Sequence, residues 1–384
     1  MTRIRAKFYL LIVATGVLAG PAPAGDIERL PKNKVPKVKP PATIAHGQKP
    51  MRIKVLAIHF NPFIAPEIHS PDDPKAKPKT IREIGGWNDP IPLAAGYAQD
   101  VCDASGGFIQ YEIVEWIIAR EFQKKNDGFT YTPEQYYRCL TKKAEWHQPD
   151  GVDYAASIER FKIVPRIESG EIDEVWWFGA PYYGYLESTM AGKDAFYING
   201  GPIEYEKVKC ERPFVIMGFN YERGVAEMLH DLCHRTESTM SRIYGGWKAD
   251  ELTSTWAEFA ANAHQSNGVA AAGTCHYPPN GVKDYDYANE REVLSTADDW
   301  LNFPNLTGQK KPVSRENWRE PHRDRDGNPA YHRNYMKWWF TRLPKAPGVY
   351  EDGRRNNWWK YLFDFHRYDE RGNPRSTHHS EPRP

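Results

Sequence analysis

Short apolar runs bounded by turn residues predict the core strands of this chain. The run 52–58 is rich in β-branched residues and ends at a turn that contains Pro62. The segment 108–118 alternates apolar and polar residues, which is the pattern of a strand with one buried face. The runs 173–179 and 213–218 are almost continuously apolar, as expected for strands buried on both faces.

Helical patterns fill the stretches between these strands. Thr132 followed by Pro133 is a favourable helix start, because threonine can cap free N–H groups and proline needs no donor at the first position. Asn220 is placed to cap a longer helix in the same way. Strands that alternate with helices predict an α/β fold, a layered sheet flanked by helices. We expect helices at 92–101, 133–146, 153–161, 221–244 and 253–264.

The C-terminal section 265–365 lacks this alternation. It is rich in loops and contains the tryptophan pairs Trp338-Trp339 and Trp358-Trp359. We expect this loop-rich aromatic section to wrap the core, so that residues 51–366 form a single α/β domain. The chain of 384 residues is also long enough for two domains.

Residues 1–24 have the layout of a cleavable signal peptide. Basic residues precede an uncharged run at 8–20, and small residues follow at 21–24. The run of about 13 residues is shorter than the roughly 20 that a spanning helix needs. The expected location is therefore secreted or periplasmic, with an uncleaved interfacial anchor as the alternative.

The two segments that flank the predicted domain are polar. Residues 25–50 alternate lysine and proline with little to bury, which predicts an extended, solvated linker. Residues 367–384 are polar and predict a disordered tail.

Composition narrows the class of partner. The net charge of +1 provides no global attraction to nucleic acid or to a membrane. No basic face, Gly-rich phosphate loop or Gly-x-Ser-x-Gly motif occurs. An extracellular polymer or peptide substrate is the partner we expect, with no nucleic acid and no membrane contact beyond export.

The predicted helix 221–244 contains the clearest candidate site. His230 and His234 are four residues apart, so both imidazoles lie on one face and can reach the same cation. Glu237 shares that face. Two histidines in surface positions, bonded to nearby carboxylates, are the simpler alternative, because the pair alone is a weak motif.

The segment 230–258 resembles the gluzincin metallopeptidases over about 30 residues. In that family two histidines of a His-Glu-x-x-His helix and a later glutamate bind zinc. His230 and His234 match the histidines, and Glu258 matches the glutamate. Asp231 stands where the family has its general-base glutamate, which is a departure from the motif. The resemblance implies zinc and peptide hydrolysis. The chain as a whole also resembles secreted bacterial proteins of unassigned function that share the segment 218–224.

His276 is a second candidate for the third metal ligand. It follows Cys275 as His234 follows Cys233, and a disulfide between these cysteines would hold their Cα atoms roughly 5–6 Å apart. The count of five cysteines leaves at least one thiol unpaired, and buried thiols throughout are the alternative. The acidic aromatic run 284–287 downstream is interpreted as solvated loop charge, with calcium or sugar binding as the alternative.

These residues predict a secreted, metal-assisted hydrolase. His230 and His234 would hold zinc together with Glu258 or His276, and the ion would lower the pKa of a bound water. The candidates for the base and for the stabilising cation are Glu237, Asp231, Glu222, Arg223 and Arg235.

Two other classes of function stay open. Glu187 and Glu222 each follow a predicted strand and would form the carboxylate pair of a glycan-active enzyme if those strands are neighbours. The third class is a non-catalytic binding protein whose aromatic loops recognise a polymer. Ligands of open α/β sheets bind beyond the carboxyl ends of strands, which makes candidate ligand-binding residues of His59, Asn61, Tyr182, Tyr183 and Asn220.

Overall fold

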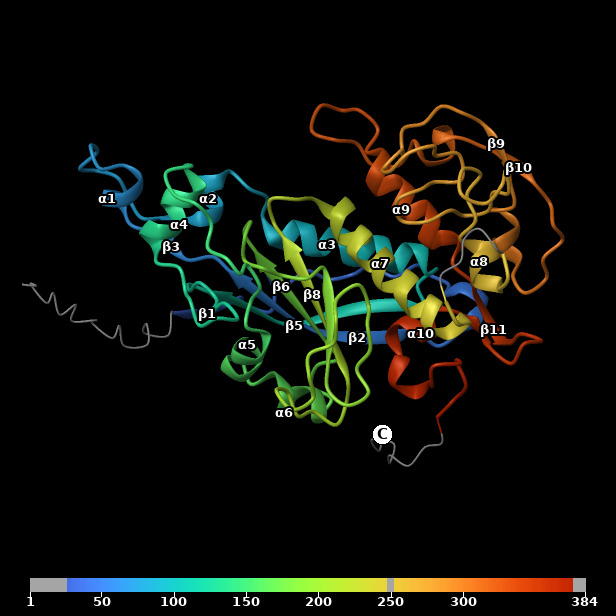
Figure 1. Ribbon diagram of the computed structural model, residues 1–384, viewed down its shortest axis with the longest axis horizontal. Coiled ribbons are helices and arrows are strands. Elements are labelled where there is room, and N and C mark those ends of the chain that lie inside the picture. The colour runs from blue at the N-terminus through green and yellow to red at the C-terminus, as the bar shows by residue number, and fades with distance from the viewer. Residues whose placement is uncertain (1–25, 247–251, 376–384) are drawn as a thin grey trace, which may run out of the picture.

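The computed structural model describes residues 26–246 and 252–375. Its centre is a six-stranded mixed sheet flanked by helices, which confirms the predicted α/β class (Figure 1). The spatial order of the strands is β1-β5-β2-β6-β8-β7. The bounds are β1 Ile27–Arg29, β2 Met51–Phe60, β5 Ile109–Ala119, β6 Glu174–Gly179, β7 Ser188–Ala191 and β8 Phe214–Asn220.

The four central strands are those that the apolar runs predict. β5, β2, β6 and β8 are parallel neighbours, and every residue of β6 is buried. The edge strands β1 and β7 are antiparallel to their neighbours. Six short strands form three pairs outside this sheet: β3 Phe63–Ile64 with β4 Lys79–Thr80, β9 Val293–Ser295 with β10 Lys311–Val313, and β11 Lys345–Val349 with β12 Arg355–Asn357.

Two long helices, α3 and α7, cross the sheet together and pack against α9 (Figure 1). The predicted cap of α4 is confirmed, since the Thr132 hydroxyl accepts a hydrogen bond from the N–H of Gln135. The helices are α1 Pro66–His69, α2 Ile81–Gly85, α3 Pro90–Ala104, α4 Pro133–Leu140, α5 Tyr154–Arg160, α6 Ile163–Glu168, α7 Val225–Tyr244, α8 Thr255–Phe259, α9 Tyr331–Arg342 and α10 Trp359–Phe363.

The start of α7 lies four residues later than predicted. Gly224 is the N-cap, and its N–H donates to the Glu227 carboxylate at 2.9 Å. Asn220 ends β8 instead, and its side chain accepts a hydrogen bond from the N–H of Glu222. The turn between them connects β8 to α7. α8 is also shorter than the predicted helix 253–264, because the backbone after Phe259 bonds to residues 271–273 instead.

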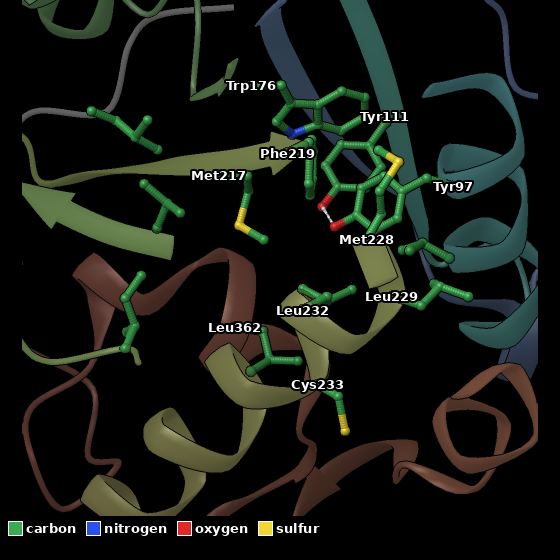
Figure 2. Close-up of a cluster of buried hydrophobic side chains, with 14 of the residues drawn as sticks. Tyr97, Tyr111, Trp176, Met217, Phe219, Met228, Leu229, Leu232, Cys233 and Leu362 are labelled. Carbon is green, nitrogen blue, oxygen red and sulfur yellow. Dashed lines mark hydrogen bonds between the residues drawn. The ribbon is translucent and has the colours of Figure 1, made fainter. Parts of the chain in front are cut away.

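One contiguous core joins the sheet, α7 and the C-terminal section. Figure 2 shows aromatic rings from α3, β5, β6 and β8 meeting the apolar face of α7, with Leu362 of α10 beside it. Trp339, Trp358 and Trp359 are fully buried in the same cluster. The aromatic section thus packs against α7 through α9 and α10 (Figure 1).

Both flanking segments are more ordered than their composition predicts. Within the predicted linker, Ile27 pairs with Ala119 on the edge of the sheet, and Val35 is buried. A short apolar stretch is enough here, because the edge of β5 supplies the backbone partners. In the predicted tail, Tyr368 is buried and the Tyr361 hydroxyl donates to the carbonyl of Gly372.

The remaining predictions at the chain ends concern parts of the sequence that the structure does not describe. The predicted signal peptide 1–24 and the last nine residues, 376–384, lie outside the described residues. None of the helices in 26–246 and 252–375 combines the length and apolar character that a bilayer crossing requires.

Candidate metal centre

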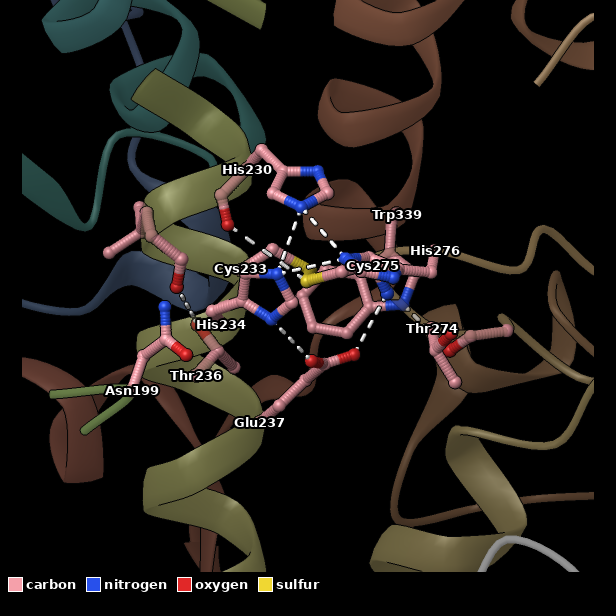
Figure 3. The surroundings of a disulfide bond; sticks show 12 residues. Asn199, His230, Cys233, His234, Thr236, Glu237, Thr274, Cys275, His276 and Trp339 are labelled. Atoms are coloured by element: carbon pink, nitrogen blue, oxygen red, sulfur yellow. Dashed lines mark hydrogen bonds and ion pairs between the residues drawn. A yellow bond between two sulfur atoms is a disulfide. The ribbon is translucent and has the colours of Figure 1, made fainter. Parts of the chain in front are cut away.

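Three histidine side chains from two segments converge beside α7. His230 and His234 come from successive turns of the helix, and His276 comes from the loop that follows α8 (Figure 3). The Nε2 atoms of His230 and His234 are 2.9 Å apart. The Nε2 atom of His276 lies 3.1 Å from the first and 3.0 Å from the second. Three ring nitrogens therefore point at one another around a single point.

The centre is closed on one side and open on the other. His230 is only 5% exposed, whereas the side chains of His234 and His276 are 19% and 31% exposed. The ring of Tyr285, itself 53% exposed, lies over His276 with the ring centroids 4.5 Å apart. The centre therefore lies near the surface on the side of His234 and His276.

A disulfide between Cys233 and Cys275 ties the two segments together. Their Cα atoms are 5.8 Å apart, which confirms the pairing considered from the sequence. The N–H of Cys275 also donates to Glu237 at 2.8 Å. Both contacts involve neighbours of the histidines, so they hold His276 against the helix. The other three cysteines, Cys102, Cys139 and Cys210, are buried thiols.

Each histidine has a partner for its second ring nitrogen. The Nδ1 atom of His234 lies 3.0 Å from Glu237, and that of His276 lies 2.8 Å from Asp284. The Nδ1 atom of His230 is 3.2 Å from Nε2 of His332. Carboxylates at Nδ1 favour the tautomer with the proton on Nδ1, which leaves a lone pair on Nε2. The lone pairs therefore face the common point.

His332 of α9 extends this arrangement outward. Its ring stacks on Tyr287 with centroids 4.5 Å apart, and its Nδ1 atom lies 3.7 Å from Glu227. A neutral His332 can accept a hydrogen bond at Nε2 from the Nδ1–H of His230, and its own Nδ1–H then faces Glu227. His230 therefore also has a partner at its Nδ1 atom, as His234 and His276 have.

The protonation of the two helix histidines differs. Burial, followed by the charges of the neighbouring histidines, lowers the pKa of His230 to about 2. In His234 burial also opposes the charged form, but the hydrogen bond and charge of Glu237 outweigh it, and the pKa is raised. His230 is thus neutral at any ordinary pH, whereas Glu237 favours a proton on His234.

Glu258, the ligand that the gluzincin resemblance implies, is not part of this cluster. It is exposed on α8, and the group of ligand atoms within reach of one ion consists of His230, His234 and His276. The predicted base Glu237 orients His234 instead, with both of its oxygens engaged.

The other predicted catalytic residues lie at different distances from the centre. Asp231 is buried on α7, and Arg223 is exposed but close enough for its charge to lower the pKa of His230, after burial and the other histidines. Arg235 points the other way, into the core, where it pairs with Glu174.

β6 and β8 are neighbours, as the glycan hypothesis requires. Glu187 accepts a hydrogen bond from Asn199. Glu222 lines a surface groove, of about 670 Å³, together with Asn88.

The predicted ligand-binding residues all have contacts within the protein. His59 is buried against Tyr221, and burial with the charges of two arginines lowers its pKa to about 3. Tyr183 is buried among aromatic rings, and Asn61 accepts a hydrogen bond from a backbone N–H. Tyr182 stacks on Trp146, and Asn220 shapes the turn before α7.

Sequence patterns missed two contributors to the centre, His332 and Glu227. His332 lies in a different helix about one hundred residues from the histidine pair, and no local spacing connects them. Asp284 was interpreted as solvated loop charge, although its position eight residues after His276 is a usable signal for a loop that folds back.

The three histidines form a group that could hold a metal ion. A second group, Cys233, Glu237 and Cys275, has its two sulfur atoms joined in the disulfide. No protein-family model, curated protein or solved structure matches the chain.

Proposed function

We propose that this chain is a metal-dependent hydrolase whose centre binds one zinc ion through His230, His234 and His276. The observation that carries the proposal is the convergence of three Nε2 atoms within 3.1 Å of one another. Nitrogens about 3 Å apart can share one ion at the usual zinc–nitrogen distance of about 2.0–2.1 Å.

The donor set supports zinc. Imidazole ligands suit zinc, copper, nickel and iron, and carboxylates hydrogen-bonded to the imidazoles are the usual outer partners of zinc-bound histidines. Glu237 and Asp284 supply such partners here. Their negative charges also balance part of the charge of a divalent ion.

The number of ligands supports catalysis over a purely structural role. Structural zinc sites have four protein ligands, whereas catalytic ones have three and leave a position open. Here three histidines converge, and two of them are partly exposed. Zinc in such a site lowers the pKa of a bound water towards 7 and so supplies a nucleophile at neutral pH.

The chain's own residues have separable roles in this proposal. The histidines hold the ion, while Glu237 and Asp284 fix the ring orientation. Arg223 lies close enough to His230 to stabilise negative charge that develops on a substrate. The substrate would be a peptide or ester outside the cell, if the predicted signal peptide acts. The ligand set departs from the gluzincin pattern, because His276 takes the place of the glutamate.

Metal analysis of purified variants tests the proposal. The wild-type chain should contain about one zinc per molecule, and H234A and H276A should lose it along with hydrolysis of 4-nitrophenyl acetate. The control is H264A, which removes an exposed imidazole outside the cluster. Retention of zinc by both ligand variants, with unchanged affinity, would rule the centre out.

A further inference from the structure

The ring of Tyr285 rests on two of the three histidines of the centre. Its centroid lies 4.5 Å from that of His276 and 5.5 Å from that of His230, and the ring planes are tilted by 35° and 23°. These separations are those of aromatic rings in contact. The two imidazoles therefore cover one face of the ring. Because Tyr285 is nevertheless 53% exposed, its open area belongs to the opposite face and the outer edge.

The loop after His276 holds this ring in place. The N–H of Tyr285 donates to the carbonyl of His276 at 3.0 Å, so the loop folds back on the histidine. Two residues later, the hydroxyl of the buried Tyr287 donates to the carbonyl of Cys275 at 2.7 Å. The amide of the buried Asn280 donates to two backbone carbonyls further along the chain, at 2.9 and 2.7 Å. The loop is therefore fixed on both sides of Tyr285.

The backbone of Tyr285 is strained. Its φ of 56° lies in the left-handed region, which bulky side chains rarely adopt. Such strain persists only where the surroundings impose it, and it gathers at sites that bind ligands. The ring is not needed to hold His276, because the disulfide Cys233–Cys275 and the carboxylate of Asp284 already fix that residue. The strained position of this half-exposed ring therefore indicates a contact outside the chain.

The ring is within reach of a substrate at the centre. An ion held by His276 at the usual zinc–nitrogen distance would lie within about 8 Å of the Tyr285 ring centroid. Aromatic rings interact when their centroids are about 4.5–7 Å apart, so a ring attached a few bonds from the acyl carbon can meet the open face. A cationic group would be repelled by the divalent ion at this range. The open face therefore suits an uncharged aromatic group best.

We propose that Tyr285 is a specificity-determining residue of this centre, whose open ring face binds an aromatic group beside the acyl carbon of the substrate. The inference rests on the proposed function. It narrows the substrate class to peptides with an aromatic residue next to the scissile bond, or to esters of aryl-substituted acids. The ring takes no part in making or breaking bonds. It supplies contact energy that distinguishes an aromatic acyl group from a small one.

Two esters with the same leaving group test the proposal, 4-nitrophenyl phenylacetate and 4-nitrophenyl acetate. In Y285A the ratio of their kcat/KM values should fall about 3- to 10-fold in favour of the acetate, which is the size of one aromatic pair contact. Y285F keeps the ring and should keep the wild-type ratio. The matched control is Y137A, which removes a partly exposed tyrosine from α4, a helix that packs against β3 and α1. A ratio in Y285A within twofold of the wild type would overturn the proposal.

Binding of hydroxamates provides a readout that needs no turnover. Benzohydroxamate and acetohydroxamate share the group that binds a metal ion and differ in the ring. Titration calorimetry with the zinc-loaded protein should show that Y285A reduces the preference for benzohydroxamate about 3- to 10-fold, while Y285F and Y137A keep it. Equal weakening of both compounds in Y285A would show that the ring only shields the histidines, and would contradict the proposal.

The zinc content of the same variants separates this inference from the proposed function. Y285A should retain zinc, because His276 keeps its other contacts, and loss of zinc from Y285A would assign the ring a structural role instead. If Y285F lost the ester preference as Y285A does, the hydroxyl and not the ring face would be responsible, which also contradicts the proposal. A wild-type chain that binds no zinc would refute the proposed function itself.

Discussion

Two polar clusters lie on different faces of α7, and they differ in how their groups are satisfied. On the face towards the sheet, Arg235 donates to Glu174 at 2.8 Å and to the carbonyl of Leu362 at 2.7 Å. Both charged side chains are almost completely buried. Donors meet acceptors there, so the protein alone completes the cluster.

On the other face, three imidazole nitrogens meet one another. When their Nδ1 atoms carry the protons, the Nε2 atoms of His230, His234 and His276 are three acceptors with no donor between them. Such an arrangement is unfavourable unless a cation occupies the shared point. In a structural polar cluster each donor meets an acceptor of the protein. In a ligand-binding cluster, acceptors face one another and need the ligand between them.

The largest effect should come from breaking the satisfied cluster. R235A leaves Glu174 buried without its partner, which typically costs about 3–5 kcal/mol of folding free energy. Chemical denaturation should show this loss, while any folded protein should still bind zinc stoichiometrically. A stability within 1 kcal/mol of the wild type would contradict the contrast between the two faces.

Removal of the disulfide should destabilise the chain and loosen the metal centre. C233A/C275A opens a loop of 42 residues, for which chain entropy predicts a loss of about 3–4 kcal/mol. Zinc affinity should fall as well, because His276 is then held by fewer contacts. Scanning calorimetry would measure the loss of folding stability, and titration calorimetry with zinc would measure the loss of affinity. C139A, which removes a buried thiol elsewhere, is the control for affinity, and equal zinc affinity in the two variants would contradict the coupling.

Loss of an orienting carboxylate should have an intermediate effect on the ion and little effect on the fold. E237Q should weaken zinc binding about 10- to 100-fold, the usual range for partners of ligand histidines. D284N should weaken it less, because Asp284 is 54% exposed and its charge is screened by water. A zinc competition assay in which D284N weakens binding more than E237Q would contradict this ranking.

The smallest effect concerns pH. The raised pKa of His234 means that the metal-free protein gains stability at low pH and loses it as the pH rises through that pKa. Zinc must displace the same proton, so zinc affinity should rise with pH until it passes that raised value. In E237Q the rise should end at lower pH. If zinc affinity depended on pH identically in the wild type and in E237Q, Glu237 would not be the cause of the raised pKa of His234.

The sequence predicted the sheet better than it predicted the site. The central strands β6 and β8 are almost continuous apolar runs, and their burial leaves few alternatives. The histidine pair was found from helical spacing, and His276 from its position beside Cys275. The contribution of His332 depends on how α9 packs against α7, which no local pattern records. The absence of Glu258 from the cluster has the same cause. Its spacing matches a known motif, but α8 is short and leaves the Glu258 side chain exposed.

X-ray absorption at the zinc edge of the zinc-loaded protein tests the central claim most directly. The account predicts three imidazole nitrogens at about 2.0–2.1 Å, oxygen in the remaining position and no sulfur. A sulfur shell at about 2.3 Å, or a spectrum without imidazole scattering, would contradict it.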